Sequence, residues 1–443
     1  MGIITDLLAD IALPKMVRVR QRFAAPEVHD VAAAVREELR RPEIARRVKP
    51  GMRIAVGVGS RGVAEIALIV RVTIEELKRL GAKPFIVPAM GSHGGATAEG
   101  QKQVLAGLGV TEESAGCPII SCMDVVELGV LDNGLAVLMD KHAYEADGII
   151  VINRIKAHNA FSGPNESGLV KMITIGLGKQ KGADAAHVLG FGRMAEFSVE
   201  MAKVKLAKLP ILFGVGSVEN AYDRVAKIAA IPAEQIIEAE RKLLVEAKAN
   251  MPKLLLQPLD ILLVDQLGKE FSGGGMDPYI TGRAPTPYLD PGPTATRVVV
   301  LDVTDRSHGN SCGVGMADIT TRRLFNKMDL EYTYANVLTS TVTPSARIGL
   351  IMDSDRLAIQ AAMKTCNAPD LGRIRMARIA NTLHVAEIYI SECMLEEARK
   401  HPDIVVLGEP QPWQFDAAGN FSDIGTWHQH VECSASPEVA VMK

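Results

Sequence analysis

Short apolar runs rich in β-branched residues alternate along this chain with longer stretches in which apolar residues recur at helical spacing. This alternation is typical of α/β proteins, in which mainly parallel sheets are flanked by helices. We therefore expect an α/β fold. The predicted strands cover residues 53–58, 83–88, 148–153, 210–215, 260–265, 297–303, 347–352 and 404–407.

The chain has 443 residues, which is long enough for two domains. Two long helices are predicted, at residues 62–80 and 232–249, and the second begins with a proline that suits a first helical turn. The strand pattern starts again after Pro252, so we predict an N-terminal α/β domain at 1–252 and a C-terminal α/β domain at 253–443. Residues 271–293 are crowded with prolines and glycines, which predicts a long ordered loop.

The composition indicates which kinds of partner the protein is suited to bind and where in the cell it is found. The net charge is −3, from 49 basic and 52 acidic residues, and only 4% of residues are aromatic, which argues against a nucleic-acid surface. The six cysteines form no Cys-x-x-Cys pair, as expected for reduced thiols in the cytoplasm. The N-terminus does not have the order of a secretory signal, and no apolar run is long enough to span a bilayer. We expect a cytoplasmic protein.

Polar, glycine-rich clusters follow three of the predicted strands. Ser60 and Arg61 follow the first, His93 follows the second, and Lys156 and His158 follow the third. The carboxyl ends of parallel strands meet at one edge of a sheet, where α/β proteins bind ligands. Arginine can hold a carboxylate or phosphate through two hydrogen bonds, and histidine titrates near neutrality. The clusters therefore predict a binding or acid/base site at this edge, with plain glycine turns or solvated loops as the alternative.

Residues 57–62 match a dinucleotide-binding fingerprint between a strand and a helix. The acid expected at the end of the next strand is missing, because residues 83–90 contain neither Asp nor Glu. The usual mode of NAD binding is therefore not favoured.

A second group of candidates follows in the chain. Lys171 lies within an apolar run, and a buried lysine is a candidate nucleophile unless its amine reaches the surface. His187 comes sixteen residues later and could bind a metal. Gln266 and Lys269 follow the strand at 260–265 and could hold an anion, or could be a solvated loop. Other polar groups of open role are the His308 loop and the C-terminal His428, His430 and Cys433.

Taken in order, these clusters resemble the nickel-pincer nucleotide-dependent lactate racemase family of 2-hydroxy acid racemases and epimerases, over residues 50–410. The resemblance implies that His93 and His158 are paired acid/base groups. It also implies that Lys171 carries the cofactor through a covalent thioamide and that His187 completes the nickel coordination. The cofactor of that family is a pyridinium-3,5-bisthiocarboxylic acid mononucleotide, whose soft sulfur donors suit nickel.

The resemblance extends to contacts around these groups. It implies that Arg61, Gln266 and Lys269 hold the substrate in a cleft between the two domains, the second domain completing the substrate site. Further cofactor contacts are implied for Ser60, Gly94 and Lys156.

The implied reaction is hydride transfer from the 2-hydroxy acid to the cofactor, which gives a planar 2-oxo acid that can accept the hydride on either face. Two histidines suit this reaction, because the two enantiomers present their hydroxyl groups on opposite sides. The chain departs from the family around Arg61, after His158 and before Lys171, which implies a divergent branch with a larger or more polar substrate. The alternatives are an oxidoreductase or lyase with a free nucleotide, and a non-catalytic small-molecule-binding protein.

Overall fold

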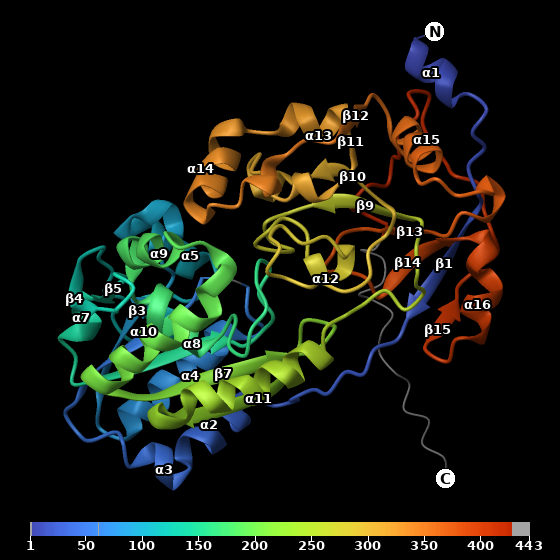
Figure 1. Ribbon diagram of the computed structural model, residues 1–443. Coiled ribbons are helices and arrows are strands. Elements are labelled where there is room, and N and C mark those ends of the chain that lie inside the picture. The colour runs from blue at the N-terminus through green and yellow to red at the C-terminus, as the bar shows by residue number, and fades with distance from the viewer. Residues whose placement is uncertain (1, 61, 428–443) are drawn as a thin grey trace, which may run out of the picture. The chain divides into compact units, whose positions relative to one another are not determined.

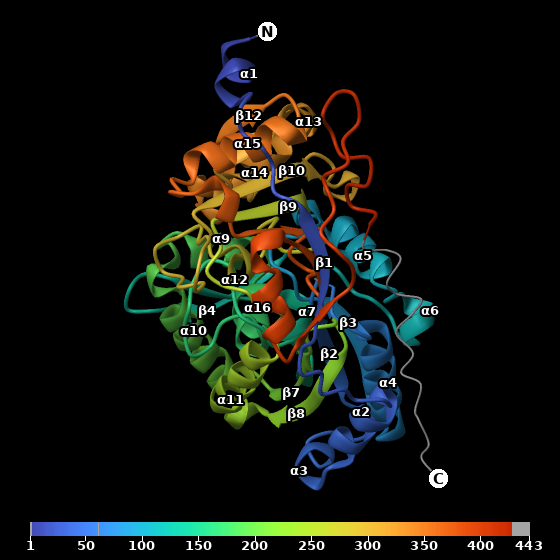
Figure 2. The ribbon, with the colours of Figure 1, turned by 90° about the vertical axis from the view of Figure 1, so that its right-hand side faces the viewer.

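The computed structural model describes residues 2–60 and 62–427, and it divides into two compact units (Figure 1). The continuous unit is Ala24–Met251. The split unit combines the described residues up to Phe23 with those from Pro252 onward. The continuous unit ends at Met251, next to the predicted domain boundary at residue 252. The residues up to Phe23 belong to the split unit, whereas the sequence analysis placed them in the domain at 1–252. Pairing of β1 (Met16–Gln21) with strands near the C-terminus is the physical reason, and Figure 2 shows β1 among them.

The continuous unit is built on a five-stranded sheet. Its first four strands in spatial order are parallel, and the fifth is antiparallel. The order is β3 (Lys83–Pro88), β2 (Arg53–Val58), β6 (Gly148–Arg154), β7 (Ile211–Glu219) and β8 (Val225–Pro232). Because β2 lies between β3 and β6, the three strand ends that carry the polar clusters are neighbours at the carboxyl edge. The predicted α/β class is confirmed.

Helices cover both faces of this sheet because side chains alternate along each buried strand. In β2, Val56 belongs to the core on one face and Ala55 to the core on the other. The first face is covered by α2 (Val31–Arg40) and α4 (Ile66–Arg79), which lie side by side in Figure 2. The second face is covered by α10 (Met194–Lys208) and α11 (Ile236–Ala249), shown in green in Figure 1.

Shorter elements complete the continuous unit. A hairpin of β4 (Val125–Val130) and β5 (Ala136–Asp140) forms a separate two-stranded sheet. A π-helical turn covers Met172–Gly176. The remaining helices are α3 (Pro42–Ala45), α5 (Ala98–Gly107), α6 (Glu112–Ala115), α7 (Lys141–Tyr144), α8 (Leu169–Lys171) and α9 (Lys179–His187).

The split unit contains an eight-stranded mixed sheet. Five neighbouring strands are parallel: β12 (Leu350–Met352), β11 (Ile319–Thr321), β10 (Arg297–Val303), β9 (Ile261–Leu267) and β13 (Met376–Ile379). The sheet continues through β14 (Glu387–Ser391), β1 and β15 (Ile404–Val406), each antiparallel to its neighbour.

Helices flank this sheet as well. One face is covered mainly by α15 (Asp355–Thr365), with α1 (Ile3–Leu8) packed beside it. The other face carries α12 (Pro278–Thr281), α13 (Arg322–Lys327) and α16 (Leu395–Lys400), and α14 (Leu330–Ser340) follows α13. The stretch 271–293 is an ordered loop that contains α12. None of the helices within the described residues is long and apolar enough to cross a membrane.

Candidate active site at the carboxyl edge of the parallel sheet

The ends of β2 and β3 bring Ser60 and His93 together. The Ser60 hydroxyl and His93 Nδ1 are hydrogen-bonded to each other. The preceding Gly59 lies so close to β6 that a Cβ there would be 2.7 Å from Oδ1 of Asn153. Only glycine fits this approach without displacing Asn153. Arg61 lies outside the described residues, so its predicted contact with substrate stays a prediction.

Two buried side chains hold the loop that carries His93. Gln101 on α5 donates through Nε2 to the carbonyl oxygens of Gly91 (2.9 Å) and His93 (3.3 Å). Its Oε1 accepts from Nζ of Lys179 at 3.1 Å. Lys179 also donates to the carbonyl of Pro88 at 2.7 Å and pairs with a buried aspartate of β5 at 3.2 Å. Lys179 thus fixes the start of α9 against the His93 loop.

Gly94, a predicted cofactor contact, follows His93 with a φ of +67°. A Cβ there would lie 2.6 Å from the backbone of Gly100 in α5. The left-handed conformation and this close approach both require glycine. The structure thus gives Gly94 a packing role, and its predicted contact with a cofactor stays a prediction.

The segment after β6 carries Lys156 and His158, and a buried carboxylate holds it. The backbone of Lys156 pairs with Ser167. The Glu166 side chain is fully buried and accepts from the backbone N–H groups of His158 (2.7 Å) and Gly163 (2.9 Å). Hydrogen bonds to a buried ionised acceptor are among the stronger ones in proteins. Glu166 therefore fixes the backbone from which the His158 side chain extends.

His158 meets Lys171 directly. The Nε2 atom of His158 lies 2.8 Å from Nζ of Lys171, the last residue of α8. The other ring nitrogen, Nδ1, accepts from the backbone N–H of Ala160 at 3.1 Å. The structure thus brings together two of the predicted site residues, one from the end of β6 and one from the helix that follows.

A second buried carboxylate holds the start of α8. Glu240 on α11 accepts from the backbone N–H of Val170 at 2.9 Å and from Nδ2 of Asn165 at 3.2 Å. Burial raises the pKa of Glu240 to about 7. A Cβ at Gly168 would lie 2.5 Å from Oε2 of Glu240, so glycine is required for this approach. Glu240 and Gly168 together position the turn of helix that ends in Lys171.

The π-helical turn Met172–Gly176 joins Lys171 to α9. Two of its carbonyl oxygens accept hydrogen bonds from a side chain outside the turn. Lys205 on α10 is fully buried and donates to the carbonyls of Ile173 (2.8 Å) and Thr174 (3.0 Å). Burial lowers the pKa of Lys205 to about 7. Turns of this kind occur often at functional sites, and here a buried amine stabilises one.

His187 ends α9 in a form suited to bind a metal. Its Nδ1 donates to the carbonyl of Ala183 at 2.6 Å, which leaves the lone pair of Nε2 available. Burial lowers the pKa of His187, which favours the neutral ring. The ring of Phe191 lies 5.4 Å from that of His187 and 5.8 Å from that of His158. Within the described part of the chain, no group of three or more His, Cys, Asp or Glu side chains is arranged to hold a metal ion.

The other predicted substrate contacts lie in the split unit. Gln266 is in β9, and a Cβ at Gly425 would lie 2.0 Å from its Oε1, so the chain near Gly425 packs directly against it. Lys269 donates through Nζ to the carbonyl of Gly273 at 2.6 Å and to the side chain of Asn336. Its backbone N–H donates to Ser307, so the loop of His308 borders Lys269. That these residues and the continuous unit share one substrate site remains a prediction.

Asp265, the acid at the end of the strand predicted at 260–265, has a structural role. It is fully buried and forms two hydrogen bonds with Arg378, both at 2.8 Å. It also accepts from the indole N–H of Trp427 at 2.7 Å. These contacts fix the C-terminal segment on the sheet. His428, His430 and Cys433 lie outside the described residues.

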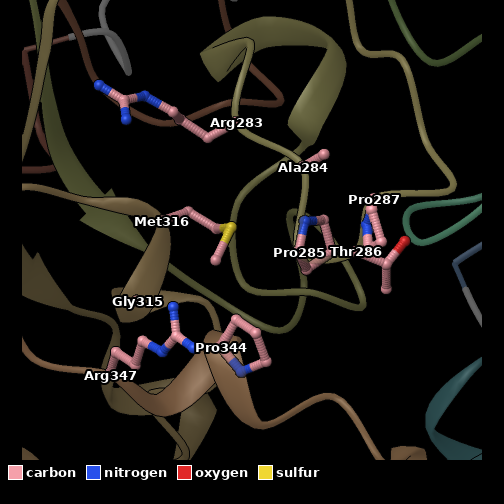
Figure 3. A pocket seen from close by; sticks show the side chains of 9 residues that line it. All are labelled: Arg283, Ala284, Pro285, Thr286, Pro287, Gly315, Met316, Pro344 and Arg347. Carbon is pink, nitrogen blue, oxygen red and sulfur yellow. The ribbon is translucent and has the colours of Figure 1, made fainter.

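A cavity of about 370 Å³ lies in the split unit, and none of the predicted site residues lines it (Figure 3). Five of its lining residues, 283–287, come from the long proline-rich loop. Figure 3 shows Met316 and Pro285 turned toward each other, with Arg347 below. Arg283 is held by Asp318 at 2.9 Å and by backbone carbonyls. The candidate acid/base and nucleophilic residues His93, His158 and Lys171 are not among the residues that line this cavity.

The fold and the site define an α/β protein in which His93 follows one strand of a parallel sheet, and His158, hydrogen-bonded to Lys171, follows another. Residues 6–197 match the sequence model of the lactate racemase N-terminal domain family, so this stretch of the chain belongs to that family. The family recognised from the motifs is therefore confirmed there. The stretch includes every predicted site residue except Gln266 and Lys269.

Two solved structures share a distant likeness with the chain. One is a lactate racemase apoprotein from Thermoanaerobacterium thermosaccharolyticum, with 13% identity, a TM-score of 0.46 and coverage of 75% of this chain and 84% of that one. The other is a protein from Thermotoga maritima, also with 13% identity and a TM-score of 0.46, covering 63% of this chain and 72% of that one. No curated protein sequence matches the chain.

Proposed function

We propose that this protein is a racemase or epimerase of a 2-hydroxy acid that works with a nickel-pincer nucleotide attached to Lys171. The observation that carries the proposal is the group formed by His158, Lys171 and His187. His158 is hydrogen-bonded to Lys171, and Phe191 lies against the rings of both histidines. A nucleophilic amine, an acid/base group and a metal ligand are the parts that this reaction needs.

The residues fit the cofactor in their donor chemistry. Nε2 of His187 is available because Nδ1 is engaged with Ala183, and a single protein ligand is enough where the cofactor brings the other donors. Lys171 would supply the nitrogen of the thioamide. Ser60, Gly94 and Lys156 are the proposed remaining cofactor contacts. When bound, the cofactor would provide a reversible acceptor for the α-hydrogen of the substrate as hydride.

The remaining groups of the chain would bind the substrate and move its hydroxyl proton. His93 and His158 would exchange that proton, one for each enantiomer. Arg61, Gln266 and Lys269 would hold the carboxylate and the hydroxyl end. The departures around Arg61 and His158 favour a substrate larger or more polar than lactate.

The test is co-production of the protein with a pathway that makes the pincer cofactor, followed by intact-mass measurement and nickel analysis. The proposal predicts a covalent adduct on Lys171 and about one nickel per chain, as one site implies. The loaded protein should then interconvert the enantiomers of a panel of 2-hydroxy acids, followed by chiral chromatography.

Matched variants separate the roles. Lys171→Ala should lose the adduct and the nickel, whereas His93→Ala should keep both and lose turnover. Racemisation by Lys171→Ala would refute the mechanism. An unmodified wild-type protein, made beside a lactate racemase that does become loaded, would favour an enzyme with a free nucleotide or a binding protein.

A further inference from the structure

Arg347 gives the cavity of about 370 Å³ in the split unit a positive charge. The residue is exposed, and Figure 3 shows its guanidinium turned toward Met316. Within the residues that the structure describes, this guanidinium forms no ion pair and no hydrogen bond. The residues that line the cavity include neither Asp nor Glu. A guanidinium in this setting can hold a carboxylate through two parallel hydrogen bonds.

The rest of the lining is mainly apolar. Met316 packs partly against the core on one face of the sheet, and its flexible side chain can adapt to the shape of a ligand. The lining also includes Ala284 and three prolines, namely Pro285, Pro287 and Pro344. The cavity thus combines one available charged group with an apolar surface, which is the usual composition of a site for a small organic molecule.

Contacts within the protein hold the walls of the cavity in place. Arg283 also lines the cavity, but its guanidinium pairs with Asp318 at 2.9 Å and with two backbone carbonyls, which fixes the proline-rich loop. The backbone N–H of Arg347 donates to the carbonyl of Pro344 at 3.2 Å. A Cβ at Gly315 would lie 1.9 Å from that carbonyl oxygen, so these two turns pack directly on each other. Walls that are fixed before binding reduce the entropy lost when a ligand binds.

The size of the cavity and its charge together define the kind of ligand. A volume of about 370 Å³ is far larger than one water molecule needs and lies in the range of small-molecule sites. Inorganic phosphate would use the guanidinium but leave the apolar walls without contact. A neutral apolar molecule would fill the space but cover the guanidinium without giving it a partner, which is costly. The lining therefore suits a single carboxylate that carries an apolar body.

We propose that this cavity binds a small organic monocarboxylate, with its carboxylate on Arg347 and its aliphatic or aromatic body against Met316 and the prolines. None of the residues assigned to the racemase reaction lines the cavity, so it is a ligand site in addition to the candidate active site. The proposal does not depend on the proposed function.

The test uses benzoate as the probe, because benzoate joins one carboxylate to a compact apolar ring. The full-length protein is labelled for NMR at its methionine methyl groups, and the Met316 signal is identified by its loss in Met316→Leu. Sodium benzoate added at constant ionic strength should shift this signal in a saturable manner, with a Kd in the millimolar range or below. Met376 and Met394 are fully buried and do not line the cavity, so their signals serve as internal references.

Matched variants and analogues test the two parts of the site. Arg347→Gln should weaken benzoate binding at least about tenfold, because a hydrogen bond to a charged group is lost. Arg373 is also exposed in the split unit but does not line the cavity, so Arg373→Gln should leave the Kd within about twofold. Benzamide has the same shape without the charge and should bind at least about tenfold more weakly than benzoate. Acetate has the charge without the ring and should also bind more weakly.

Several outcomes would overturn the inference. A Met316 signal that shows no saturable shift at tens of millimolar benzoate would mean that the cavity does not bind this class of ligand. Equal affinity of the wild type and Arg347→Gln, with the reference signals unchanged, would remove Arg347 from the site. Equal binding of benzoate and benzamide, or of benzoate and acetate, would contradict the assigned ligand class. None of these measurements needs the nickel cofactor, so they stand whether or not the proposed function fails.

Discussion

Replacing Glu166 with alanine should release the chain segment that carries His158. The carboxylate is fully buried and accepts from the backbone N–H groups of His158 and Gly163 at 2.7 and 2.9 Å. Alanine leaves both part-buried groups, and also Nζ of Lys248 at 2.6 Å, without this acceptor, and an unsatisfied N–H costs up to about 1–3 kcal/mol where it is buried. The two backbone N–H groups together predict a loss of about 2–6 kcal/mol in the local stability of the segment.

Hydrogen–deuterium exchange measures this loss where it occurs. The lower figure corresponds to roughly 30-fold faster exchange of the two amides, because each 1.4 kcal/mol is a factor of ten. Global denaturation is a weaker assay here, since a chain with two compact units need not unfold in one step.

Glu246→Ala is the matched control on the neighbouring helix. Glu246 is half-exposed and pairs with Lys227 at 2.9 Å, and a surface pair of this kind contributes about 0–1 kcal/mol. Its removal should leave exchange at His158 and Gly163 within about fivefold of the wild type, as that energy allows. If Glu166→Ala and Glu246→Ala gave the same exchange rates, Glu166 would not hold this segment.

Three further changes have defined outcomes. Lys171→Ala should abolish the covalent adduct seen in the intact mass, and a retained adduct would place the attachment elsewhere. Burial raises the pKa of Glu240 from 4.5 to about 7, so the protonated form is favoured in the folded state. The stability that this gives is complete below about pH 4.5 and is lost as the pH rises through 7, a change of about 3 kcal/mol. Glu240→Gln should flatten this part of the pH dependence in urea unfolding, and an unaltered slope would contradict the assignment. Gly425→Ala should displace the Gln266 side chain, since the added Cβ would lie 2.0 Å from Oε1, and the loaded enzyme should show a higher KM with a smaller change in kcat. An unchanged KM would remove Gln266 from the substrate site.

Local pattern predicted the parallel strands of the continuous unit, but in the split unit it missed the short parallel strands β11 and β13. The strands at 53–58, 83–88 and 297–303 have the predicted bounds, because each is a short apolar run between polar ends. The strand predicted at 347–352 is shorter and begins at Leu350, since a single turn of 3₁₀ helix at Thr343–Ala346 precedes it. Helix 62–80 begins later than predicted, at Ile66. Ends are less predictable than interiors because capping depends on neighbouring segments.

The residues that hold the site were harder to find from the sequence. Lys179 and Lys205 are ordinary in pattern, yet both are fully buried and hydrogen-bonded to carbonyl groups of the site. Glu240 acts on Val170, 70 positions earlier in the chain. A lysine or glutamate on a helix is usually solvated, so only its partners reveal the buried exception. The sequence offered one indication of close packing here, namely the glycines near the site residues, such as Gly59, Gly94 and Gly168.

The sequence by itself determined the α/β class, the polar clusters at three strand ends and the order of the chemical groups, because these depend on side-chain type and short-range periodicity. Tertiary structure decided the rest. It placed β1 in a sheet with strands more than 360 residues away, as the pairing of Met16 with Ser391 shows. It also set the hydrogen bonds of His158 and His187: Nε2 of His158 lies against Lys171, and Nδ1 of His187 is bonded to the carbonyl of Ala183. The pairing of β1 and the hydrogen bonds of the two histidines depend on contacts between groups that the folded chain brings together. Those contacts form only when the cores on each side of the sheets are packed.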